Sequence, residues 1–270
     1  MTGALVAALG MYDFPWTAAA NDALWAAIAA RLRARGVAAP LRLSRTIDLA
    51  ASWRDPGLIF GQTCGYPYVS ALRGVVAPVA TPVYAFDGCE GADHSSFVVA
   101  RKDDPRRALA EFAGARAAIN ARDSNSGMNL FRATIAPLAR DGRFFGAVVE
   151  TGSHRASLAA IGAGAADLAA IDCVSFALVA AGLPALVENI AIVARTPLAP
   201  GLPFVMSAGL ARDRLDVLRE ALFAALADPA LAPARATLGL VGAKILDERD
   251  YDRIGAIERT AIAAGYPALA

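Results

Sequence analysis

The sequence alternates between short apolar runs and longer segments in which an apolar residue recurs every three or four positions. Residues 4–11 are the first apolar run and are typical of a buried strand in a parallel sheet. Residues 17–35 are predicted to form a helix, because Leu24, Ile28 and Leu32 recur at intervals of four along one helical face. A strand followed by a helix is the unit from which α/β proteins are built.

The same alternation continues along the rest of the chain. Further strands are predicted at residues 58–61, 75–80, 96–100, 115–120, 144–150, 166–171, 186–194 and 202–207. Further helices are predicted at residues 128–139, 153–162, 172–181, 210–227 and 250–264. Turns are predicted at residues 81–82 and 87–91. The pattern therefore predicts an α/β fold with mostly parallel sheets flanked by helices.

The C-terminal part of the sequence has several predicted helices but few strands of its own. It is best accommodated by packing on the first strands of the chain. This predicts a discontinuous first lobe, residues 1–90 and 190–270, and an inserted second lobe, residues 91–189. Two chain crossings make a hinge, and we expect a ligand cleft between the lobes.

Charge and composition narrow the classes of function. The chain has 26 basic and 25 acidic residues, a net charge of +1 and no dense run of Lys or Arg. We therefore predict no nucleic-acid partner and no association with an anionic membrane. Hydrophobic residues make up 56% of the chain, which excludes disorder. The longest apolar stretch, residues 173–187, is short for a membrane span and contains Gly182 and Pro184, so no membrane insertion is predicted.

The three cysteines, Cys64, Cys89 and Cys173, are widely spaced and odd in number. With no CxxC pair and only two histidines, a zinc site is not expected, and we predict no metal and no other cofactor. Each cysteine is interpreted as a small buried hydrophobic residue. The sparse, odd set favours a reducing compartment over a disulfide framework.

The N-terminal segment, residues 1–16, has an apolar centre but no basic residue before it. Asp13 and Pro15 stand where a signal-peptide cleavage site would be prepared. We interpret the segment as the first strand and predict a cytoplasmic protein as the sequence is written. A periplasmic location is the alternative, if a leader has been removed.

A polar turn, Asp123-Ser124-Asn125-Ser126-Gly127, lies between a predicted strand and a predicted helix. Free backbone N–H groups at a helix start, together with hydroxyls and the positive end of the helix dipole, favour an anion. Ordinary capping is the alternative, since Asp, Ser and Asn are preferred N-cap residues. One cap needs one such residue, and here four lie in a row beside a glycine.

A second polar segment, residues 150–157, occupies the same position between a strand and a helix. Its Ser153 and His154 offer a hydroxyl and an imidazole at the helix start. His154 is a candidate donor to a ligand oxygen, and the pKa of its side chain is sensitive to what it meets. A surface histidine near a cap is the alternative.

Other candidates lie where predicted strands begin or end. Gln62 and Thr63 offer amide and hydroxyl groups at the carboxyl end of a strand, the ligand edge of an open α/β sheet. Cys64 follows them, and no spacing identifies a base that would activate it, so a structural or ligand-lining role is favoured over a nucleophile. Asp172 is either a helix N-cap or an acceptor for a ligand hydroxyl or ammonium. The remaining candidates at strand ends or starts are Tyr12, Tyr84, Ser96 and Asn120.

Four segments occur in the order GQTCGYP, SSFVVARKDD, AAINARDSNSG and ETGSHRASLAAIGAGAADLAAIDC. In this order they resemble the PhnD-like family of phosphate, phosphite and phosphonate ABC-transporter substrate-binding proteins, over about residues 57–195. The most specific part is residues 152–172. The resemblance implies a two-lobed type II periplasmic-binding-protein fold. It also implies a small anionic ligand and an ABC permease as partners.

The resemblance implies roles for particular residues as well. Ser124, Ser126 and Gly127 match the family's hydroxyl-rich helix start, which holds the oxyanion. His154 matches the histidine at the next helix start, and Asp172 matches the carboxylate of the cleft. Ser96 matches a serine on the strand leading into the second lobe. Tyr12 and residues 62–64 correspond to the wall of the first lobe.

Two features set this chain apart from the family pattern. Asn125 interrupts the run of hydroxyls, and Asp172 would repel a bare dianion. The ligand is therefore expected to carry a hydroxyl, a proton or an ammonium group as well as an oxyanion.

We predict a solute-binding protein that closes on a phosphonate, phosphate ester or similar oxyanion, as a transporter component or a soluble sensor. The alternative is a cytoplasmic enzyme on the same fold, resembling menaquinone-pathway lyases. The sequence identifies no nucleophile–base or acid–base set, which favours binding over catalysis. The effector lobe of a transcription regulator would need a helix-turn-helix, whereas this chain begins with a strand.

Overall fold

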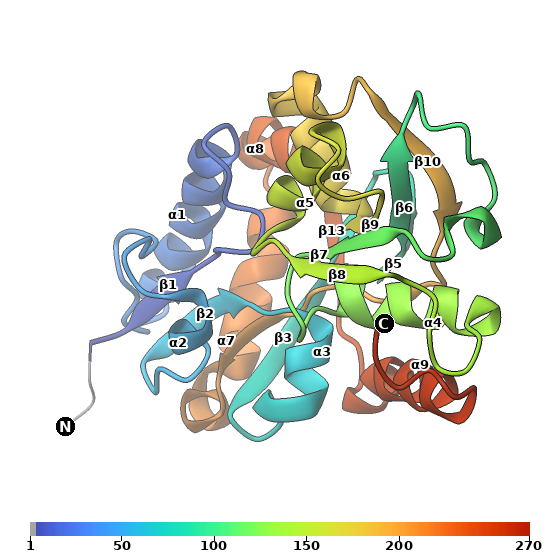
Figure 1. Cartoon of the computed structure of the whole chain (residues 1–270). Coiled ribbons are helices and arrows are strands. Elements are labelled where there is room, and N and C mark those ends of the chain that lie inside the picture. The colour runs from blue at the N-terminus through green and yellow to red at the C-terminus, as the bar shows by residue number, and fades with distance from the viewer. Residues whose placement is uncertain (1–3) are drawn as a thin grey trace. The chain divides into compact units, whose positions relative to one another are not determined.

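Short runs of buried aliphatic residues form the strands of two five-stranded sheets within residues 4–270, the part of the chain that the computed structural model describes. Residues 1–3, the start of the N-terminal segment interpreted above as the first strand, lie outside the described residues. Figure 1 traces the chain, which divides into two units. Unit 1 holds residues 4–85 and 201–250, and unit 2 holds residues 86–200 and 251–270.

The sheet of unit 1 has the strand order β1-β2-β12-β3-β13. Its strands are β1 (Val6–Ala8), β2 (Leu58–Gln62), β3 (Val76–Tyr84), β12 (Phe204–Ser207) and β13 (Leu240–Lys244). β1 and β2 are parallel, whereas β12 and β13 run antiparallel to their neighbours. Every residue of β2 is buried, so this strand forms part of the unit's core.

The helices of unit 1 are α1 (Ala18–Ala34), α2 (Leu49–Ser52), α3 (Gly65–Pro67), α7 (Ala208–Leu226) and α8 (Ala232–Leu238). α1 connects the parallel strands β1 and β2 and packs against α7 and α8. It buries the face predicted from the sequence, including Leu24, Ile28 and Leu32. Trp25 of α1 stacks on Phe60 of β2 with ring centroids 5.6 Å apart, which holds the helix against the sheet.

Unit 2 contains a five-stranded sheet of order β10-β6-β9-β7-β8 and a small three-stranded sheet. The larger sheet consists of β6 (Ser96–Arg101), β7 (Arg116–Ile119), β8 (Ala147–Glu150), β9 (Leu168–Asp172) and β10 (Ile190–Arg195). The smaller consists of β4 (Cys89–Glu90), β5 (Asp93–His94) and β11 (Ala199–Pro200). In the larger sheet β7, β8 and β9 are parallel, whereas β6 runs against β9 and β10 runs against β6.

The helices of unit 2 are α4 (Leu130–Ile135), α5 (His154–Gly162), α6 (Cys173–Gly182) and α9 (Asp252–Ala263). The chain leaves β7 through α4 to reach β8, and returns through α5 to β9 on the other side of β7. Because parallel crossovers are right-handed, these opposite steps place α4 and α5 on opposite faces of the sheet, as Figure 1 shows. Because β7, β8 and β9 are parallel, the helix starts that follow them lie at one edge of the sheet.

The C-terminal segment completes unit 2. α9 packs on α4 and on β11. The backbone oxygen of Ala270 accepts hydrogen bonds from the N–H groups of Phe144 and Phe145, at 2.6 and 2.9 Å, and from the Tyr266 hydroxyl at 2.9 Å. The predicted first lobe comprises residues 1–90 and 190–270, whereas the structure has residues 86–200 and 251–270 in unit 2.

The predicted strands and helices are present with shifted ends, and two expectations are corrected. Thr81 and Pro82 lie inside β3 rather than in a turn, because β13, which the pattern did not reveal, pairs with this part of β3. The sheets are mixed rather than mostly parallel, since β12 and β13 in unit 1 and β6 and β10 in unit 2 run against their neighbours. The α/β class itself is confirmed.

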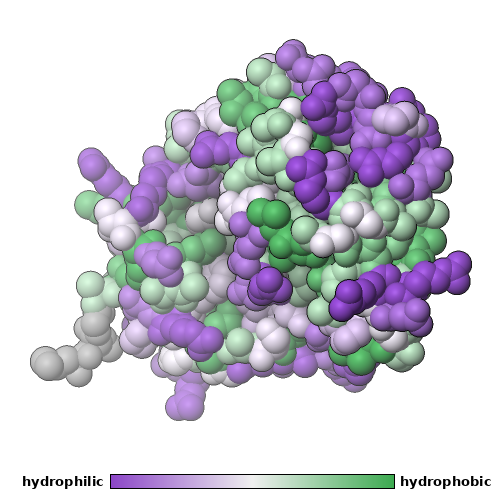
Figure 2. Space-filling model, viewed as in Figure 1, coloured by the Kyte–Doolittle hydropathy of each residue, from purple (hydrophilic) through white to green (hydrophobic). Residues whose placement is uncertain are grey.

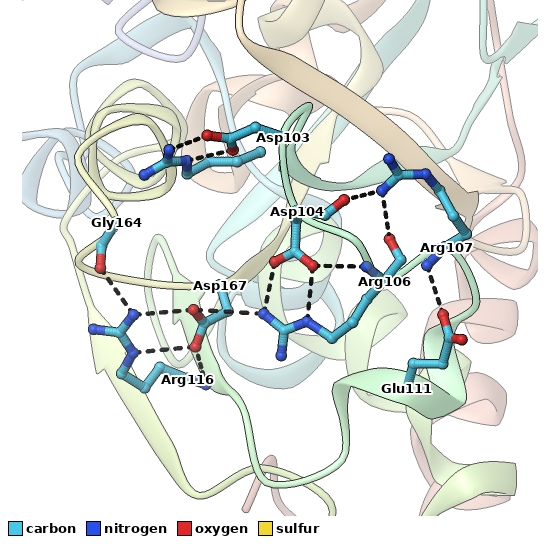
Figure 3. Close-up of polar contacts among 9 residues, drawn as sticks. Asp103, Asp104, Arg106, Arg107, Glu111, Arg116, Gly164 and Asp167 are labelled. Carbon is cyan, nitrogen blue, oxygen red and sulfur yellow. Dashed lines mark hydrogen bonds and ion pairs between the residues drawn. The ribbon is translucent and has the colours of Figure 1, made fainter.

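An ion-pair network lies on unit 2 (Figure 3). Arg116 binds Asp167 through two hydrogen bonds of 2.9 and 3.1 Å, and Arg106 binds Asp104 through two of 2.7 and 2.9 Å. The arginine hydrogen bonds hold the pKa of both carboxyl groups below its usual range. Some of these side chains border a pocket of about 330 Å³. The arginines neutralise both carboxylates, so we interpret the network as structural.

Figure 2 shows hydrophilic residues over much of the visible face, with smaller hydrophobic areas between them. The mean hydropathy of +0.43 nevertheless reflects a chain rich in apolar residues. Within residues 4–270, no helix combines the length and the apolar character needed to cross a membrane.

Candidate functional site

The helix after β7 begins with a capped turn. The Ser124 side chain accepts a hydrogen bond from the Gly127 N–H at 3.0 Å, which makes Ser124 the N-cap. A π-helical turn, Asn125–Asn129, follows and continues into α4, so the helix begins before the predicted residue 128. Ser124 therefore serves as an ordinary helix cap, which is the alternative given above to anion binding by this turn. The Ser126 hydroxyl has a different partner.

That partner is His154, at the neighbouring helix start. Ser153 caps α5 by accepting a hydrogen bond from the Ala156 N–H at 3.1 Å, which places His154 at the first helical position. The Ser126 Oγ lies 2.9 Å from His154 Nε2. The two polar segments follow the parallel neighbours β7 and β8, whose carboxyl ends lie at the same sheet edge. One hydrogen bond thus joins two segments that the sequence presented separately.

Gly127 allows a third side chain to approach the same point. A Cβ at position 127 would lie 1.9 Å from Asn120 Oδ1 and 3.1 Å from His154 Cε1. Asn120 Oδ1 is buried and accepts no hydrogen bond from any of the residues that the structure describes. Because buried polar atoms are normally paired, this oxygen is a candidate ligand contact. Glycine is therefore required at 127 to bring Asn120 and His154 together.

Asp172 brings a buried carboxylate to this sheet edge. It ends β9 and caps α6, with Oδ2 accepting a hydrogen bond from the Ser175 N–H at 2.9 Å. The residue is only 2% exposed, and Oδ1 has no hydrogen-bond donor within residues 4–270. An unpaired buried carboxylate oxygen is costly, so a donor on a ligand would stabilise it. The two interpretations of Asp172 are thus compatible, because Oδ2 caps the helix and Oδ1 is the candidate acceptor for a ligand.

Ser96 holds the helix start from the side of β6. It lies opposite Asp172 in the antiparallel β6–β9 pair. Its hydroxyl donates to the Ser126 carbonyl oxygen at 3.0 Å, and its N–H donates to Thr196 Oγ1 at 2.8 Å. These contacts support a positioning role for Ser96, and direct contact with a ligand stays a prediction.

Both histidines of the chain interact electrostatically with Asp172. Burial lowers the pKa of His154, opposed by the Asp172 carboxylate and by the Ala170 carbonyl. Burial likewise lowers the pKa of His94 on β5, opposed by Asp172 and by Asp93. Both imidazoles are therefore neutral at neutral pH, and each offers one N–H donor. His94 was not predicted as a site residue, because it lies among turn residues without periodicity.

The first turns of the helix after β7 are supported by the C-terminal segment. Asn129 Nδ2 donates to Asn125 Oδ1 at 3.0 Å and to a carbonyl of α9 at 3.2 Å. The buried Arg132 donates to Asn129 Oδ1 and to the Pro267 carbonyl, both at 2.8 Å, and pairs with Glu258 at 3.2 Å. Asn129 and Arg132 were not predicted from the sequence. Their contacts in the C-terminal segment lie 125 or more positions away, beyond any local pattern.

The candidates of unit 1 are buried and lie at or after the ends of β1, β2 and β3. The Gln62 side-chain N–H donates to a backbone carbonyl at 3.1 Å, and the backbone N–H of Thr63 donates to another at 3.2 Å. Cys64 follows them and is buried. Tyr12 and Tyr84 meet edge to face, with ring centroids 5.7 Å apart. The structure therefore brings the two tyrosines together, and a ligand role for all five residues stays a prediction.

Two expectations about cysteines and metals can be set beside the structure. Cys64 and Cys173 are buried as expected, whereas Cys89 is only partly buried and lies against Cys173. Among the described residues, no group of three or more His, Cys, Asp or Glu side chains is placed to hold a metal ion.

Three solved structures share the fold of this chain. XAC2383 from Xanthomonas citri, bound to ATP, is 18% identical, with 97% of this chain and 98% of that chain covered and a TM-score of 0.72. A binding protein component of an ABC phosphonate transporter from Pseudomonas aeruginosa is 16% identical, with 98% and 89% covered and a TM-score of 0.76. PhnD1 from Prochlorococcus marinus, in complex with methylphosphonate, is 16% identical, with 96% and 98% covered and a TM-score of 0.72. The fold is that of the type II periplasmic binding proteins, as the sequence predicted.

The family follows from the sequence itself. The family of ABC transporter, phosphonate, periplasmic substrate-binding proteins matches residues 58–251. The chain belongs to this family, which confirms the resemblance seen in its motifs. The family consists of solute-binding proteins for transport and is not an enzyme family, so the binding function is favoured over the lyase alternative. A small ligand and an ABC permease are the partners that the family implies. No curated protein matches the chain.

Proposed function

We propose that unit 2 binds a small phosphonate or phosphate ester whose oxyanion contacts Ser126 and His154. One observation carries this proposal: the Ser126–His154 hydrogen bond of 2.9 Å joins two helix starts beside a buried carboxylate oxygen of Asp172 that lacks a donor within residues 4–270. A hydroxyl and a neutral imidazole can both donate to an oxyanion. As a carboxylate, Asp172 can only accept a hydrogen bond, so we expect a donor group on the ligand.

The charge of Asp172 narrows the ligand class. A bare dianion would be repelled by the carboxylate, whereas a ligand with a proton, hydroxyl or ammonium group would supply the missing donor. We therefore propose amine-bearing or hydroxyl-bearing phosphonates ahead of dianions that carry no donor group. The family description, which specifies phosphonate, and the methylphosphonate bound by PhnD1 from Prochlorococcus marinus both support phosphorus oxyanions over carboxylates.

The experiment is isothermal titration calorimetry of the full chain with methylphosphonate, 2-aminoethylphosphonate, inorganic phosphate and acetate. We expect at least one phosphonate to bind and acetate not to bind. Ser126→Ala removes a donor worth about 0.5–1.5 kcal/mol and should weaken phosphonate binding by up to about tenfold. Binding of none of the phosphorus oxyanions, or unchanged affinity in Ser126→Ala, would contradict the proposal.

Ser70→Ala is the matched control. Its hydroxyl is hydrogen-bonded as well, to the Tyr66 carbonyl at 2.8 Å within a helical segment, but it lies in unit 1. The variant should bind the phosphonate as the wild type does. A thermal-shift measurement on all three proteins separates loss of binding from loss of folding, because a ligand that binds only the folded state raises the melting temperature.

We also propose that the protein works outside the cytoplasm and delivers its ligand to an ABC permease. The support is the family description, which specifies both a periplasmic location and an ABC transporter. Fractionation of cells that express the natural gene product should find the protein in the osmotic-shock fluid. Its retention with the cytosolic enzymes would contradict this part of the proposal.

A further inference from the structure

Two of the three cysteines are neighbours in the structure. Cys89 on β4 and Cys173 at the start of α6 are 84 positions apart in sequence, yet their sulfur atoms lie 3.4 Å apart. Both are free thiols within unit 2, whereas Cys64 belongs to unit 1. The spacing along the sequence gave no sign of this proximity.

One short backbone segment holds both cysteines in place. Cys89 lies opposite His94 in the β4–β5 pair, and the Cys173 N–H donates to the Ser95 carbonyl at 3.2 Å. The Ser95 N–H and hydroxyl both donate to the Gly88 carbonyl, at 2.9 and 3.0 Å. Gly88 has a φ of +88°, and a Cβ there would lie 2.7 Å from the Cβ of Cys173. Only glycine allows the hairpin backbone to approach Cys173 so closely.

Two ion pairs fix the hairpin that carries Cys89. Arg195 binds Asp87 through two hydrogen bonds of 2.7 and 2.6 Å. Arg253 binds Asp93 through two hydrogen bonds of 2.8 and 2.7 Å. Cys89 lies between the two anchored aspartates in sequence, so its backbone is held on both sides. The proximity of the sulfur atoms therefore belongs to a braced part of unit 2.

We propose that Cys89 and Cys173 are an oxidative modification site, at which an intramolecular disulfide forms by exchange with a low-molecular-weight disulfide such as oxidised glutathione. A disulfide bond is about 2.05 Å long, so the two sulfur atoms must approach by roughly 1.4 Å. Rotation about the two Cα–Cβ bonds and a small backbone shift provide this movement. The product links the β4–β5 hairpin covalently to the first residue of α6.

The exchange proceeds in two balanced steps. Cys89, the partly exposed thiol, loses its proton and attacks one sulfur of oxidised glutathione, which forms a mixed disulfide and releases one glutathione thiolate. The Cys173 thiol then loses its proton, attacks Cys89 Sγ and releases the second glutathione. Two protein thiols have lost two protons and two electrons, and one glutathione disulfide has become two thiols.

The closing step depends on the pKa of Cys173. The hydrogen bond with Cys89, burial and the nearby Asp172 charge all raise the pKa of the Cys173 thiol, and burial and the Asp172 charge still act once Cys89 is in the mixed disulfide. A thiol with a raised pKa contributes little thiolate at neutral pH. Closure of the mixed disulfide by Cys173 therefore accelerates as the pH rises.

The test equilibrates the full chain with mixtures of reduced and oxidised glutathione, blocks the remaining thiols with iodoacetamide and analyses the peptides by mass spectrometry. We expect a cross-linked pair of peptides containing Cys89 and Cys173, two hydrogen atoms lighter than the separate peptides, with Cys64 alkylated. Alkylation of all three cysteines at the most oxidising ratio would overturn the inference. Glutathione that stays on Cys89 without closure would overturn it as well.

Matched variants assign the link. Cys64→Ser should keep the cross-link, and Cys89→Ser should abolish it. Thermal unfolding of the wild type should occur at a higher temperature in the oxidised form than in the reduced form, because the link restricts the unfolded chain. Cys89→Ser should show no such difference. Equal melting temperatures for the two forms of the wild type would show that the link does not fit the native fold, whether or not the phosphonate proposal holds.

Discussion

Two clusters of polar side chains in unit 2 differ in how their carboxylates are satisfied. In the ion-pair network of Figure 3, Asp104 and Asp167 each accept two hydrogen bonds from an arginine side chain. The second cluster, which we call the helix-start cluster, contains Ser126, His154 and Asp172. One oxygen of Asp172 caps α6, and the other is buried without a donor within residues 4–270. The network is complete as it stands. The helix-start cluster is not, and we interpret the missing donor as part of the ligand.

The two clusters also differ in how they contribute to the free energy of folding. Ion pairs near the surface typically contribute about 0–1 kcal/mol each, because water competes for the charges. A buried polar atom without a partner costs about 1–3 kcal/mol, and more when it is charged. A binding site can retain this cost, since the ligand recovers it. Incomplete hydrogen bonding, rather than the number of charges, therefore marks the candidate site.

Asp172→Asn tests the incomplete cluster and has the largest expected effect. Asparagine keeps the shape and a capping oxygen but removes the charge. Affinity for 2-aminoethylphosphonate should fall by about 10- to 100-fold, which corresponds to a charge-assisted hydrogen bond of about 1.5–3 kcal/mol. Methylphosphonate should lose much less. Calorimetric titration of both ligands measures the difference.

The matched control for this variant is Asp48→Asn. Asp48 caps α2 in unit 1 by accepting a hydrogen bond from the Ala51 N–H at 3.0 Å, so it shares the capping role of Asp172. Its replacement should leave both affinities unchanged. Equal losses of affinity for the two ligands in Asp172→Asn would show that Asp172 acts only as a helix cap. The proposed contrast between the two clusters would then be wrong.

Gly127→Ala probes the convergence of Asn120 and His154. The added methyl group would overlap Asn120 Oδ1 and press on the His154 ring, so one or both must move. We expect phosphonate affinity to fall by about tenfold, the effect of losing about 1.4 kcal/mol from displaced contacts. Gly162→Ala at the end of α5 has open space around it and should bind normally. Normal affinity in Gly127→Ala would show that the site does not depend on this packing.

The two clusters should also respond to different ranges of pH. Burial lowers the pKa of His94 and His154, so below about 6.5 the unfolded chain binds more protons than the folded chain and the free energy of unfolding falls. The pKa values of Asp104 and Asp167 are lowered, so their contribution persists at these pH values and is lost only below about 4. Urea denaturation across this range measures both losses. His154→Asn should reduce the first loss, and an unchanged profile would contradict the assignment.

Asp167→Asn should have the smallest effect. It removes one carboxylate from the complete network, whose exposed pairs contribute at most about 1 kcal/mol each. Denaturation at neutral pH should show a loss of no more than that amount, and phosphonate affinity should equal that of the wild type. A fall in affinity similar to that of Asp172→Asn would assign a binding role to the network and its adjoining pocket.

Local patterns in the sequence were sufficient for the elements that carry the site. The helix starts at Ser124 and Ser153 and the cap at Asp172 were predicted, because capping residues stand directly between apolar strands and amphipathic helices. β13 was missed, since its five residues carry only a weak apolar pattern and depend on pairing with β3. Thr81 and Pro82 were consequently predicted as a turn, although they continue a strand.

Contacts between distant segments could not be predicted from these patterns. The Ser126–His154 hydrogen bond spans 28 positions, and the contact between Cys89 and Cys173 spans 84. His94 lies in a turn-rich hairpin, and its relation to Asp172 exists only after β5, β6 and β9 have assembled. Family motifs supplied part of this information, because they linked Ser126, His154 and Asp172. They gave no indication of Asn129, Arg132 or His94.

The support of the site helix by residues 251–270 has a consequence for the order in which the protein acquires its structure. A ribosome synthesises the chain from the N-terminus, and the earlier segments become available to fold first. Arg132 lacks the Pro267 carbonyl, and the N–H groups of Phe144 and Phe145 lack the oxygen of Ala270, until the segment that provides these acceptors has been made. Unit 1 needs no residue beyond 250, whereas unit 2 must wait for the last segment. The half of the molecule that bears the proposed binding site is therefore the later of the two to mature during translation.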